Sequence, residues 1–172
     1  MKRVVVTNSP DETERLGRRI GRKLRRDDVL SLIGDLGAGK TCLTRGIVAG
    51  LGADPTVVSS PTFVLIHEYA LPPTSPDKPA VLYHVDLYRL DSWRDFEDIG
   101  GEETFSELGV CVIEWADRIA ALLPEDALRV SLIVCDELSR EIVIEGDAER
   151  FPWLMTLDAV EPRDEVETAT PA

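Results

Sequence analysis

Short apolar runs alternate with amphipathic segments along the chain, and this pattern predicts strands and helices in turn. Seven segments are rich in β-branched and aromatic residues or alternate apolar with polar positions, as strands do. They are residues 2–7, 29–33, 63–69, 81–88, 110–113, 128–135 and 141–145. Residues 29–33 are almost wholly apolar, as expected for a strand that is buried on both faces. The alternation with helical segments predicts an α/β fold.

The connections between the predicted strands indicate a sheet of mixed direction. No helical pattern lies between residues 63–69 and 81–88, and parallel strands need a longer crossover, so these two segments are predicted to form a hairpin. The alternating segments 128–135 and 141–145 flank a short polar turn and predict a second hairpin. We therefore expect a partly antiparallel sheet.

The segment after the first strand predicts an amphipathic helix with a basic outer face. Ser9 is the expected N-cap, Pro10 takes the first helical position and Glu12 closes a capping box, with the helix running to about Arg26. One arc of this helix collects the basic residues Arg15, Arg18, Arg19, Arg22, Lys23, Arg25 and Arg26. We interpret the arc as a solvated surface; the alternative is a docking face for an acidic partner or RNA.

Further helices are predicted from periodicity and capping residues. Apolar residues recur at helical spacing from Leu43 to Leu51, and Gly50 and Gly52 stop that helix. Shorter helical segments are expected at residues 92–99, 103–108, 116–123 and 151–160, and Ser92 is a suitable cap for the first of them.

The run Gly34-Asp35-Leu36-Gly37-Ala38-Gly39-Lys40-Thr41 has the G-x-x-x-x-G-K-T spacing of a phosphate-binding P-loop. Glycines allow backbone N–H groups to surround phosphate oxygens. Lys40 is expected to reach the β- and γ-phosphates, and the Thr41 hydroxyl to hold Mg²⁺. The loop lies between a predicted strand and a predicted helix, which is the context that the motif requires. The pattern therefore predicts binding of a nucleoside triphosphate.

Length, charge and cysteine content limit which ligands, location and domain organisation are expected. The chain has 172 residues and a formal net charge of −13, with acidic residues concentrated toward the end. Such a chain is a poor nucleic-acid binder by itself, because phosphate contacts need Lys and Arg. No apolar run approaches the length of a membrane span, and Cys42, Cys111 and Cys135 form no C-x-x-C pair, so we expect a cytoplasmic protein with reduced thiols. We expect one domain over residues 1–146 and an acidic, partly disordered extension over 147–172.

Two carboxylates are candidates to complete the P-loop site. Glu114 follows a fully apolar strand, and Asp86 lies near the end of another strong strand, where ligands bind in open α/β sheets. One of them can hold the metal while the other orients or deprotonates the attacking water. Each has a structural alternative. Asp86 can instead be a surface acid that pairs with Arg89, and Glu114 can instead cap the end of its strand. His67 and His84 are interpreted as structural, and Trp115 as stacking on a base or packing in the core.

The motifs occur together in one known family. Gly34–Thr41 (GDLGAGKT), 60–63 (SPTF), 84–89 (HVDLYR) and 113–115 (IEW) resemble, in order and spacing, the bacterial TsaE (YjeE) ATPases of the tRNA threonylcarbamoyladenosine system. The resemblance covers about residues 4–146. It implies a P-loop NTPase-like three-layer sandwich around a mixed sheet. It also implies ATP and Mg²⁺ as cofactors and slow hydrolysis.

The resemblance further implies partners and residue roles. The partners are a threonylcarbamoyl transferase subunit and its scaffold, which modify adenosine 37 of tRNAs reading ANN codons; tRNA contact is indirect, and no membrane is involved. The implied catalytic residues are the carboxylate Asp86 and Lys40. Thr41 and Glu114 are implied to hold the metal. Ser60 and Thr62 are implied to belong to a switch that senses the γ-phosphate. The implied nucleotide contacts are Asp35, Leu36, Gly37, Ala38, Gly39, Lys40, Thr41, Cys42, Trp115 and Arg140, with Ser9 and Thr13 around the same pocket.

Other functions for a P-loop chain remain open from the residues. The N/T-K-x-D pattern that reads guanine is absent, which favours adenine. A small metabolite kinase would need an arginine-rich lid, for which only Arg89, Arg94 and Arg118 are available. A nucleotide sensor that never hydrolyses its ligand is the third possibility. Our working hypothesis is an ATPase whose binding docks it to its partners and whose hydrolysis resets the complex.

Overall fold

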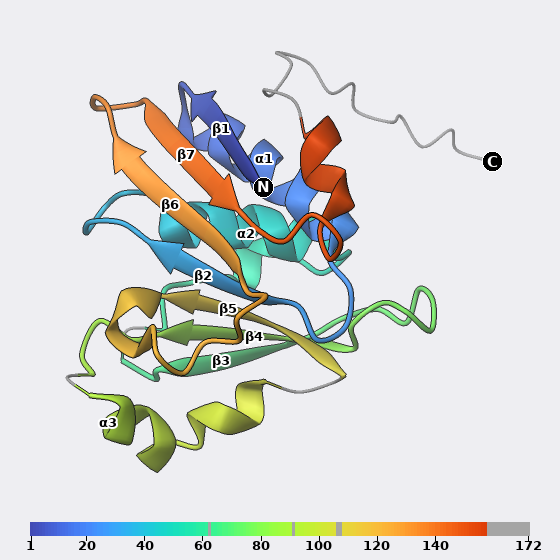
Figure 1. Ribbon diagram of the computed structural model, residues 1–172, viewed down its shortest axis with the longest axis vertical. Helices are drawn as coiled ribbons and strands as arrows, with labels where there is room; N and C mark the ends of the chain where they lie inside the picture. Colours follow the sequence, from blue (N-terminus) through green and yellow to red (C-terminus); the bar gives the residue numbers. More distant parts are fainter. Residues whose placement is uncertain (62, 91, 106–107, 158–172) are drawn as a thin grey trace.

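A seven-stranded mixed sheet forms the centre of the computed structural model, which describes residues 1–61, 63–90, 92–105 and 108–157 (Figure 1). The strands are β1 (Lys2–Thr7), β2 (Val29–Ile33), β3 (Ile66–Ala70), β4 (Val81–Asp86), β5 (Gly109–Glu114), β6 (Leu128–Val134) and β7 (Arg140–Glu145). Their order is β1-β7-β6-β2-β5-β4-β3. Strands β6, β2, β5 and β4 run parallel, whereas β1 and β7 at one edge and β3 at the other pair antiparallel. The two predicted hairpins and the mixed sheet are confirmed.

Helices cover both faces of this sheet and make the fold a three-layer sandwich, as expected for a P-loop NTPase. The α-helices are α1 (Pro10–Lys23), α2 (Lys40–Gly50) and α3 (Trp93–Asp98), and short 3₁₀ helices are η1 (Pro55–Val57), η2 (Gly101–Thr104), η3 (Ala116–Ile119) and η4 (Pro152–Thr156). Helices α1 and α2 pack with one apolar cluster, and α3 and η3 pack with a second cluster on the opposite face.

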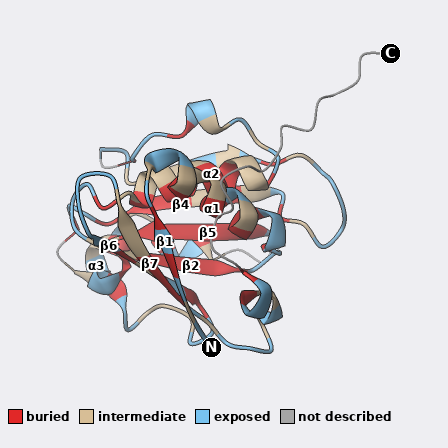
Figure 2. Ribbon diagram, turned by 90° about the horizontal axis from the view of Figure 1, so that it is seen from above, coloured by how far each residue is buried: buried red, intermediate tan, exposed pale blue. Residues whose placement is uncertain are grey.

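Strand β5 shows why the sheet is covered on both sides. All six of its residues are buried, and the central strands are red in Figure 2. Val110 and Val112 belong to the cluster of α1 and α2, whereas Cys111 and Ile113 belong to the cluster of α3. Successive side chains of a strand point to opposite faces, so an uninterrupted apolar run needs a layer on each side. Glu114, at the end of this run, is therefore brought to the carboxyl edge of a central strand.

Helices α1 and α2 touch backbone to backbone through glycines spaced four residues apart on each helix. A Cβ atom at Gly17 or Gly21 of α1 would meet the carbonyl oxygen of Leu43 or Ile47 of α2. A Cβ atom at Gly46 or Gly50 of α2 would likewise meet backbone atoms of α1. Because residues four apart lie on one helix face, the two glycine pairs form one continuous contact. The position of α2, whose first residues are Lys40 and Thr41, is thereby fixed by α1.

The two ends of α1 differ from the prediction. The Ser9 Oγ accepts the Glu12 N–H at 3.2 Å, but the Glu12 carboxylate accepts the N–H of Asn8 at 2.7 Å, so the predicted capping box is only half formed. The helix ends at Lys23 rather than near Arg26, because Leu24 is extended. Lys78 Nζ donates to the carbonyls of Arg22 and Leu24 at 2.7 and 3.0 Å, and so satisfies groups that a longer helix would have satisfied.

Two other predicted elements differ in their boundaries. Strand β3 begins at Ile66 rather than Phe63, because the carbonyl of Pro61 accepts the N–H of Val64 and of Leu65 in a turn. The helix predicted at residues 116–123 is only the 3₁₀ turn η3. By contrast, α3 has the Ser92 cap that the sequence predicts.

The packed part of the chain continues beyond residue 146, where the sequence placed the end of the domain. Phe151, Leu154 and Leu157 are buried in the cluster of α1 and α2. Within the predicted extension, residues 147–157 therefore pack on the core through these three side chains, and residues 158–172 lie outside the described residues.

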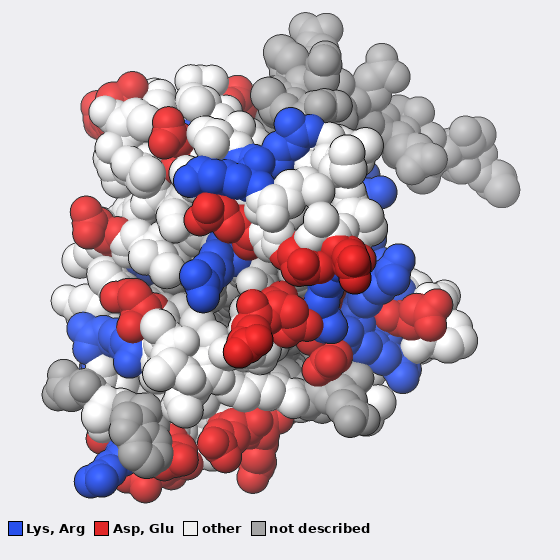
Figure 3. Space-filling view, in the orientation of Figure 1, with Lys and Arg blue, Asp and Glu red and all other residues white. Residues whose placement is uncertain are grey.

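The surface carries both signs of charge in adjacent patches on the face shown in Figure 3. Arg18, Arg22 and Lys23 on the outer side of α1 are exposed, as the amphipathic pattern predicts. In the described part of the chain, no helix has the length and apolar character needed to cross a membrane.

Candidate functional site

The P-loop motif forms the turn between β2 and α2, as predicted. Gly37 and Gly39 have φ values of 78° and 104°, a region that favours glycine. A Cβ atom at Gly34 would lie 2.6 Å from the Leu132 carbonyl oxygen, so only glycine fits where the loop leaves the sheet. Helix α2 begins at Lys40 and presents its unpaired N–H groups and positive dipole end to the loop. The loop therefore has the geometry of an anion-binding site.

Lys40 is folded back into this loop. Only 4% of the residue is exposed, and its Nζ donates to the carbonyls of Gly34 at 2.6 Å and Asp35 at 3.0 Å. Its Nζ also lies 3.8 Å from the centre of the Trp115 ring, in a cation–π contact. Burial lowers the pKa of Lys40, and the nearby Glu114 and Asp86 carboxylates oppose that shift. A phosphate group would supply a stronger partner for this ammonium than the carbonyls do.

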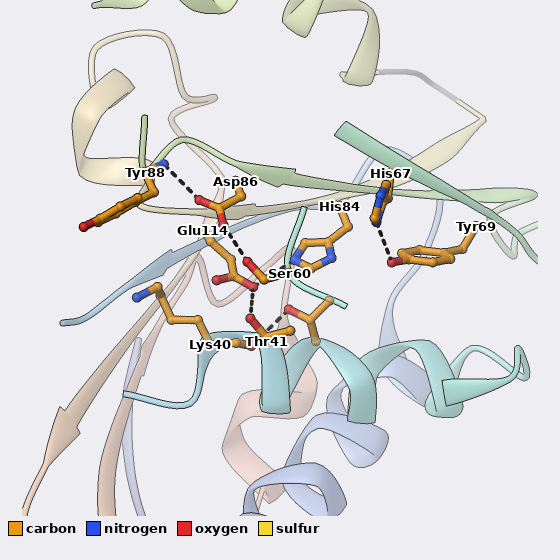
Figure 4. A network of polar contacts seen from close by, with 10 residues as sticks. Lys40, Thr41, Ser60, His67, Tyr69, His84, Asp86, Tyr88 and Glu114 are labelled. Atoms are coloured by element: carbon orange, nitrogen blue, oxygen red, sulfur yellow. Dashed lines mark hydrogen bonds and ion pairs between the residues drawn. The ribbon is translucent and has the colours of Figure 1, made fainter. Parts of the chain in front are cut away.

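Thr41 and Glu114 meet directly across the site (Figure 4). Thr41 Oγ1, on the first turn of α2, donates to Glu114 Oε1 at 2.8 Å. His84 Nε2 lies 2.8 Å from the same oxygen. The hydroxyl and carboxylate come from residues far apart in the sequence, yet they are already within hydrogen-bond distance. Hydroxyl and carboxylate oxygens are ligands that Mg²⁺ accepts.

Asp86 lies beside Glu114, because the two residues are in register on the neighbouring strands β4 and β5. Asp86 is 1% exposed. Its Oδ2 accepts the hydroxyl of Ser60 at 2.8 Å, and its Oδ1 accepts the N–H of Tyr88 at 2.9 Å. The predicted switch residue Ser60 is thus hydrogen-bonded to the predicted catalytic carboxylate. Thr62, the second predicted switch residue, lies outside the described residues.

A cavity of about 290 Å³ joins these groups. It is lined by residues that the sequence singled out: Leu36, Gly37, Gly39, Lys40, Thr41, Cys42, Ser60, Asp86, Glu114 and Trp115. Tyr88 also lines it, and sequence reasoning gave that residue no role. Its ring lies 5.1 Å from the ring of Trp115, centre to centre, so the two aromatic side chains form one wall.

Three predicted nucleotide contacts, Asp35, Ala38 and Arg140, are not part of the cavity lining. Arg140 donates from Nε to the carbonyl of Ala38 at 3.0 Å and from Nη2 to that of Gly37 at 3.3 Å. The carbonyl of Asp35 accepts from Lys40 and from the N–H of Ala38. These contacts hold the loop in shape. Direct contact of Asp35, Ala38 and Arg140 with a nucleotide stays a prediction.

Cys42, Ser9 and Thr13 lie beside the loop on α1 and α2. The Cys42 thiol contacts the carbonyl of Pro10 at 3.3 Å, and burial raises the pKa of that thiol to about 11. Thr13 is buried and its hydroxyl lies 2.8 Å from that of Thr7. These are packing contacts, and direct contact of Cys42 with a nucleotide stays a prediction, because Cys42 also lines the cavity.

Comparison with known proteins identifies the family. The family model described as threonylcarbamoyl adenosine biosynthesis protein TsaE matches residues 7–142. The chain belongs to the TsaE family. Two relatives named tRNA threonylcarbamoyladenosine biosynthesis protein TsaE illustrate the similarity. The protein from Treponema pallidum is 43% identical over 81% of this chain and 97% of its own length, and the protein from Bacillus subtilis is 38% identical over 86% and 88%.

A solved structure of similar fold supports the same conclusion. The crystal structure of Bacillus subtilis YdiB superposes with a TM-score of 0.69 and 31% identity, covering 91% of this chain and 93% of that one. The architecture of this chain is therefore shared with a solved structure to which it is similar in sequence as well as in fold.

His84 is the residue of this TsaE-family site that sequence reasoning interpreted differently. The side chain was expected to be structural, but its ring nitrogen contacts Glu114, the predicted metal ligand. One signal was available in the sequence. His84 stands two positions before Asp86 on the same predicted strand, and alternation puts such residues on one face of the sheet.

Proposed function

We propose that this TsaE-family chain is an ATP-binding and slowly hydrolysing subunit required for threonylcarbamoylation of adenosine 37 in tRNAs reading ANN codons. The observation that carries the proposal is the hydrogen bond between Thr41 and Glu114 at the end of the P-loop. A P-loop that only packed in the core would not need a hydroxyl and a carboxylate paired at the edge of a cavity.

The residues fit a triphosphate with Mg²⁺. The P-loop N–H groups and Lys40 would bind the phosphates, Thr41 and Glu114 would hold the metal, and the Tyr88–Trp115 wall would contact the nucleotide. Among the described residues, no cluster of three or more acidic, histidine or cysteine side chains could hold a metal. This agrees with Mg²⁺, which usually takes one or two protein carboxylates and completes its shell with phosphates and water. Bound Mg²⁺ would supply charge stabilisation at the phosphates.

Asp86 is suited to act on the attacking water. It is buried beside Glu114, and contacts from Ser60 and Tyr88 fix both of its oxygens. A carboxylate held in this way can accept a hydrogen bond from water and orient it toward the γ-phosphate. Ser60 would change partner when the γ-phosphate is present, which gives the loop around it a switch role.

Slow hydrolysis by the isolated chain follows from the charge of the site. The described lining of the cavity contains Lys40 but no arginine. Arg89 instead lies 4.0 Å above the ring of Phe63, and Arg118 donates to the carbonyl of Leu90. P-loop enzymes often receive a catalytic arginine from a partner protein. The same placement argues against a kinase, which would need arginines over the phosphates.

The proposed partners are a threonylcarbamoyl transferase subunit and its scaffold, with tRNA contacted through them. Support comes from the family name, which assigns the relatives to this biosynthesis, and from the net charge of −13, which disfavours tRNA binding by this chain alone. ATP binding would dock the subunit, and hydrolysis would reset the complex after each modification.

Binding of a fluorescent ATP analogue tests the first half of the proposal. The wild type should bind it more tightly with Mg²⁺ than with EDTA, and Lys40→Ala should lose most of the affinity. Lys2→Ala is the matched control, because Lys2 is an exposed lysine paired with Glu145. Equal binding by Lys40→Ala and wild type would remove the P-loop from the function.

Reconstitution with the transferase and scaffold tests the second half. Asp86→Asn keeps an oxygen for Tyr88 and a polar group for Ser60, so it should bind nucleotide but stop after about one round of tRNA modification. Full multi-turnover modification by this variant would refute the reset role. A phosphorylated small molecule formed by the chain alone would show a kinase instead.

A further inference from the structure

His84 occupies a position where the pattern of the core calls for an apolar residue. It follows Leu82 on the face of β4 that lies under α1 and α2, and it is 0% exposed. Burying an imidazole there is unfavourable unless its polar atoms find partners. One atom does: Nε2 lies 2.8 Å from Glu114 Oε1. The other, Nδ1, has no hydrogen-bond partner in the described part of the chain.

These contacts assign the proton on the ring. A carboxylate can only accept hydrogen bonds, so Nε2 must carry the hydrogen that faces Glu114. An N–H at Nδ1 would be buried without an acceptor, which is costly. The geometry therefore makes Nε2–H the donor to Glu114 Oε1.

The contact also makes the two carboxylate oxygens of Glu114 different in their hydrogen bonding. Oε1 accepts from both Thr41 and His84, at 2.8 Å each. Oε2 accepts no hydrogen bond from the described residues, although Glu114 lines the cavity. With Oε1 held by two donors from two different elements, α2 and β4, the carboxylate has one defined rotation.

We propose that His84 is a positioning residue that orients Glu114 so that Oε2 is presented to the metal of the nucleotide. This inference rests on the proposed binding of Mg²⁺ and ATP. Side chains that hydrogen-bond a metal ligand fix its orientation, and their loss typically lowers metal affinity by about 10- to 100-fold. His84 thus acts through Glu114 and need not touch the nucleotide.

The chain offers a matched control. His67 is in register with His84 on the neighbouring strand β3, and the two are the only histidines of the sequence. The ring of His67 contacts the hydroxyl of Tyr69 at 3.2 Å and is not part of the cavity lining. Substitution of His67 should leave Glu114 undisturbed.

The test compares binding of a fluorescent ATP analogue in Mg²⁺ and in EDTA for His84→Leu, His84→Gln and His67→Gln. We expect His84→Leu to lower the Mg²⁺-dependent gain in affinity by about tenfold or more while leaving the metal-free affinity unchanged. Gln has a side-chain N–H that can take the place of Nε2, so His84→Gln should recover most of the gain. His67→Gln should match the wild type.

An independent readout uses nitrogen NMR of the two imidazole rings, assigned with His67→Gln. The His84 ring should carry a hydrogen on Nε2, and the Nε2 signal should be perturbed in Glu114→Gln. A His84 ring without a hydrogen on Nε2 would overturn the inference, as would an unchanged Mg²⁺-dependent gain in a folded His84→Leu variant. If the wild type shows no gain from Mg²⁺, the proposed function fails, whereas the spectrum still tests the contact between His84 and Glu114.

Discussion

The glycine contact between α1 and α2 predicts that Gly46→Ala destabilises the protein. A Cβ atom at this position would lie 2.8 Å from the carbonyl carbon and 2.9 Å from the Cα of Glu14, and real Cβ atoms essentially never come closer than 3.0 Å to another heavy atom. The obstacle is backbone, so no side chain can rotate away. The two helices must separate, or α2 must tilt.

Two opposing terms give the expected size. Ala is favoured over Gly inside a helix by about 1 kcal/mol. Overpacking of a tight contact costs about 1–3 kcal/mol, and a backbone obstacle puts this site at the upper end. The net loss should be about 2 kcal/mol, which corresponds to a fall in Tm of about 4–8 °C for a domain of this size.

Urea unfolding followed by circular dichroism at 25 °C measures this difference, with the slope m expected to stay constant. Ala49→Gly is the control, because it isolates helix propensity at a half-buried position of the same helix and should cost about 1 kcal/mol. A Gly46→Ala variant that is as stable as the wild type would refute the reasoning. It would show that α2 is free to move relative to α1.

The remaining predictions concern charge, thiols and the carboxylate of the site. Burial raises the pKa of Asp28, although the nearby Arg150 lowers it. The unfolded chain therefore loses the Asp28 proton at a lower pH than the folded protein does, so the free energy of unfolding falls as the pH rises above the ordinary pKa of this carboxyl. Urea unfolding should therefore show that the stability of Asp28→Asn increases relative to that of wild type as the pH rises above 3.8, the ordinary pKa of this carboxyl. A relative loss of stability over this rise in pH would contradict the prediction. Burial raises the pKa of the Cys111 thiol to about 12 and that of the Cys42 thiol to about 11, whereas Cys135 is exposed. A disulfide reagent at pH 8 should therefore react rapidly with Cys135 alone in the native chain, and with all three thiols in urea. Finally, Glu114→Ala leaves the buried His84 N–H and the partly buried Thr41 hydroxyl without an acceptor, and the loss at His84 alone should cost about 1–3 kcal/mol. Glu114→Gln keeps an acceptor and should unfold near the wild-type urea midpoint. Equal losses in the two variants would contradict the role of these contacts.

Local signals in the sequence were sufficient for most of the fold. Strand β2 and the P-loop follow from apolar patterning and glycine spacing, and the structure has them at the predicted residues; α2 follows the loop as expected but begins at Lys40, before the first predicted apolar position at Leu43. The proximity of the two predicted carboxylates was predictable for the same reason. Glu114 and Asp86 end strong strands, and the sheet brings the carboxyl ends of adjacent parallel strands together.

The features that were missed depend on contacts distant in sequence or on unusual backbone geometry. Helix α1 ends early because Lys78, from the loop between β3 and β4, satisfies its last carbonyls. Strand β3 begins late because Leu65 has a φ of 72°, which a β-propensity pattern cannot reveal. Tyr88 and Trp115 form a wall because β4 and β5 are neighbours, which neither residue shows by itself.

Arg140 also affects the entropic cost of filling the P-loop. From the start of β7 it holds the carbonyls of Gly37 and Ala38, while Lys40 holds those of Gly34 and Asp35. Two cations thus keep a glycine-rich segment in one shape before any anion arrives. A flexible loop would lose conformational freedom on binding, whereas this preorganised loop has already lost it during folding. In the proposed function, part of the affinity for a phosphate group would therefore be set by an arginine that lies outside the cavity lining.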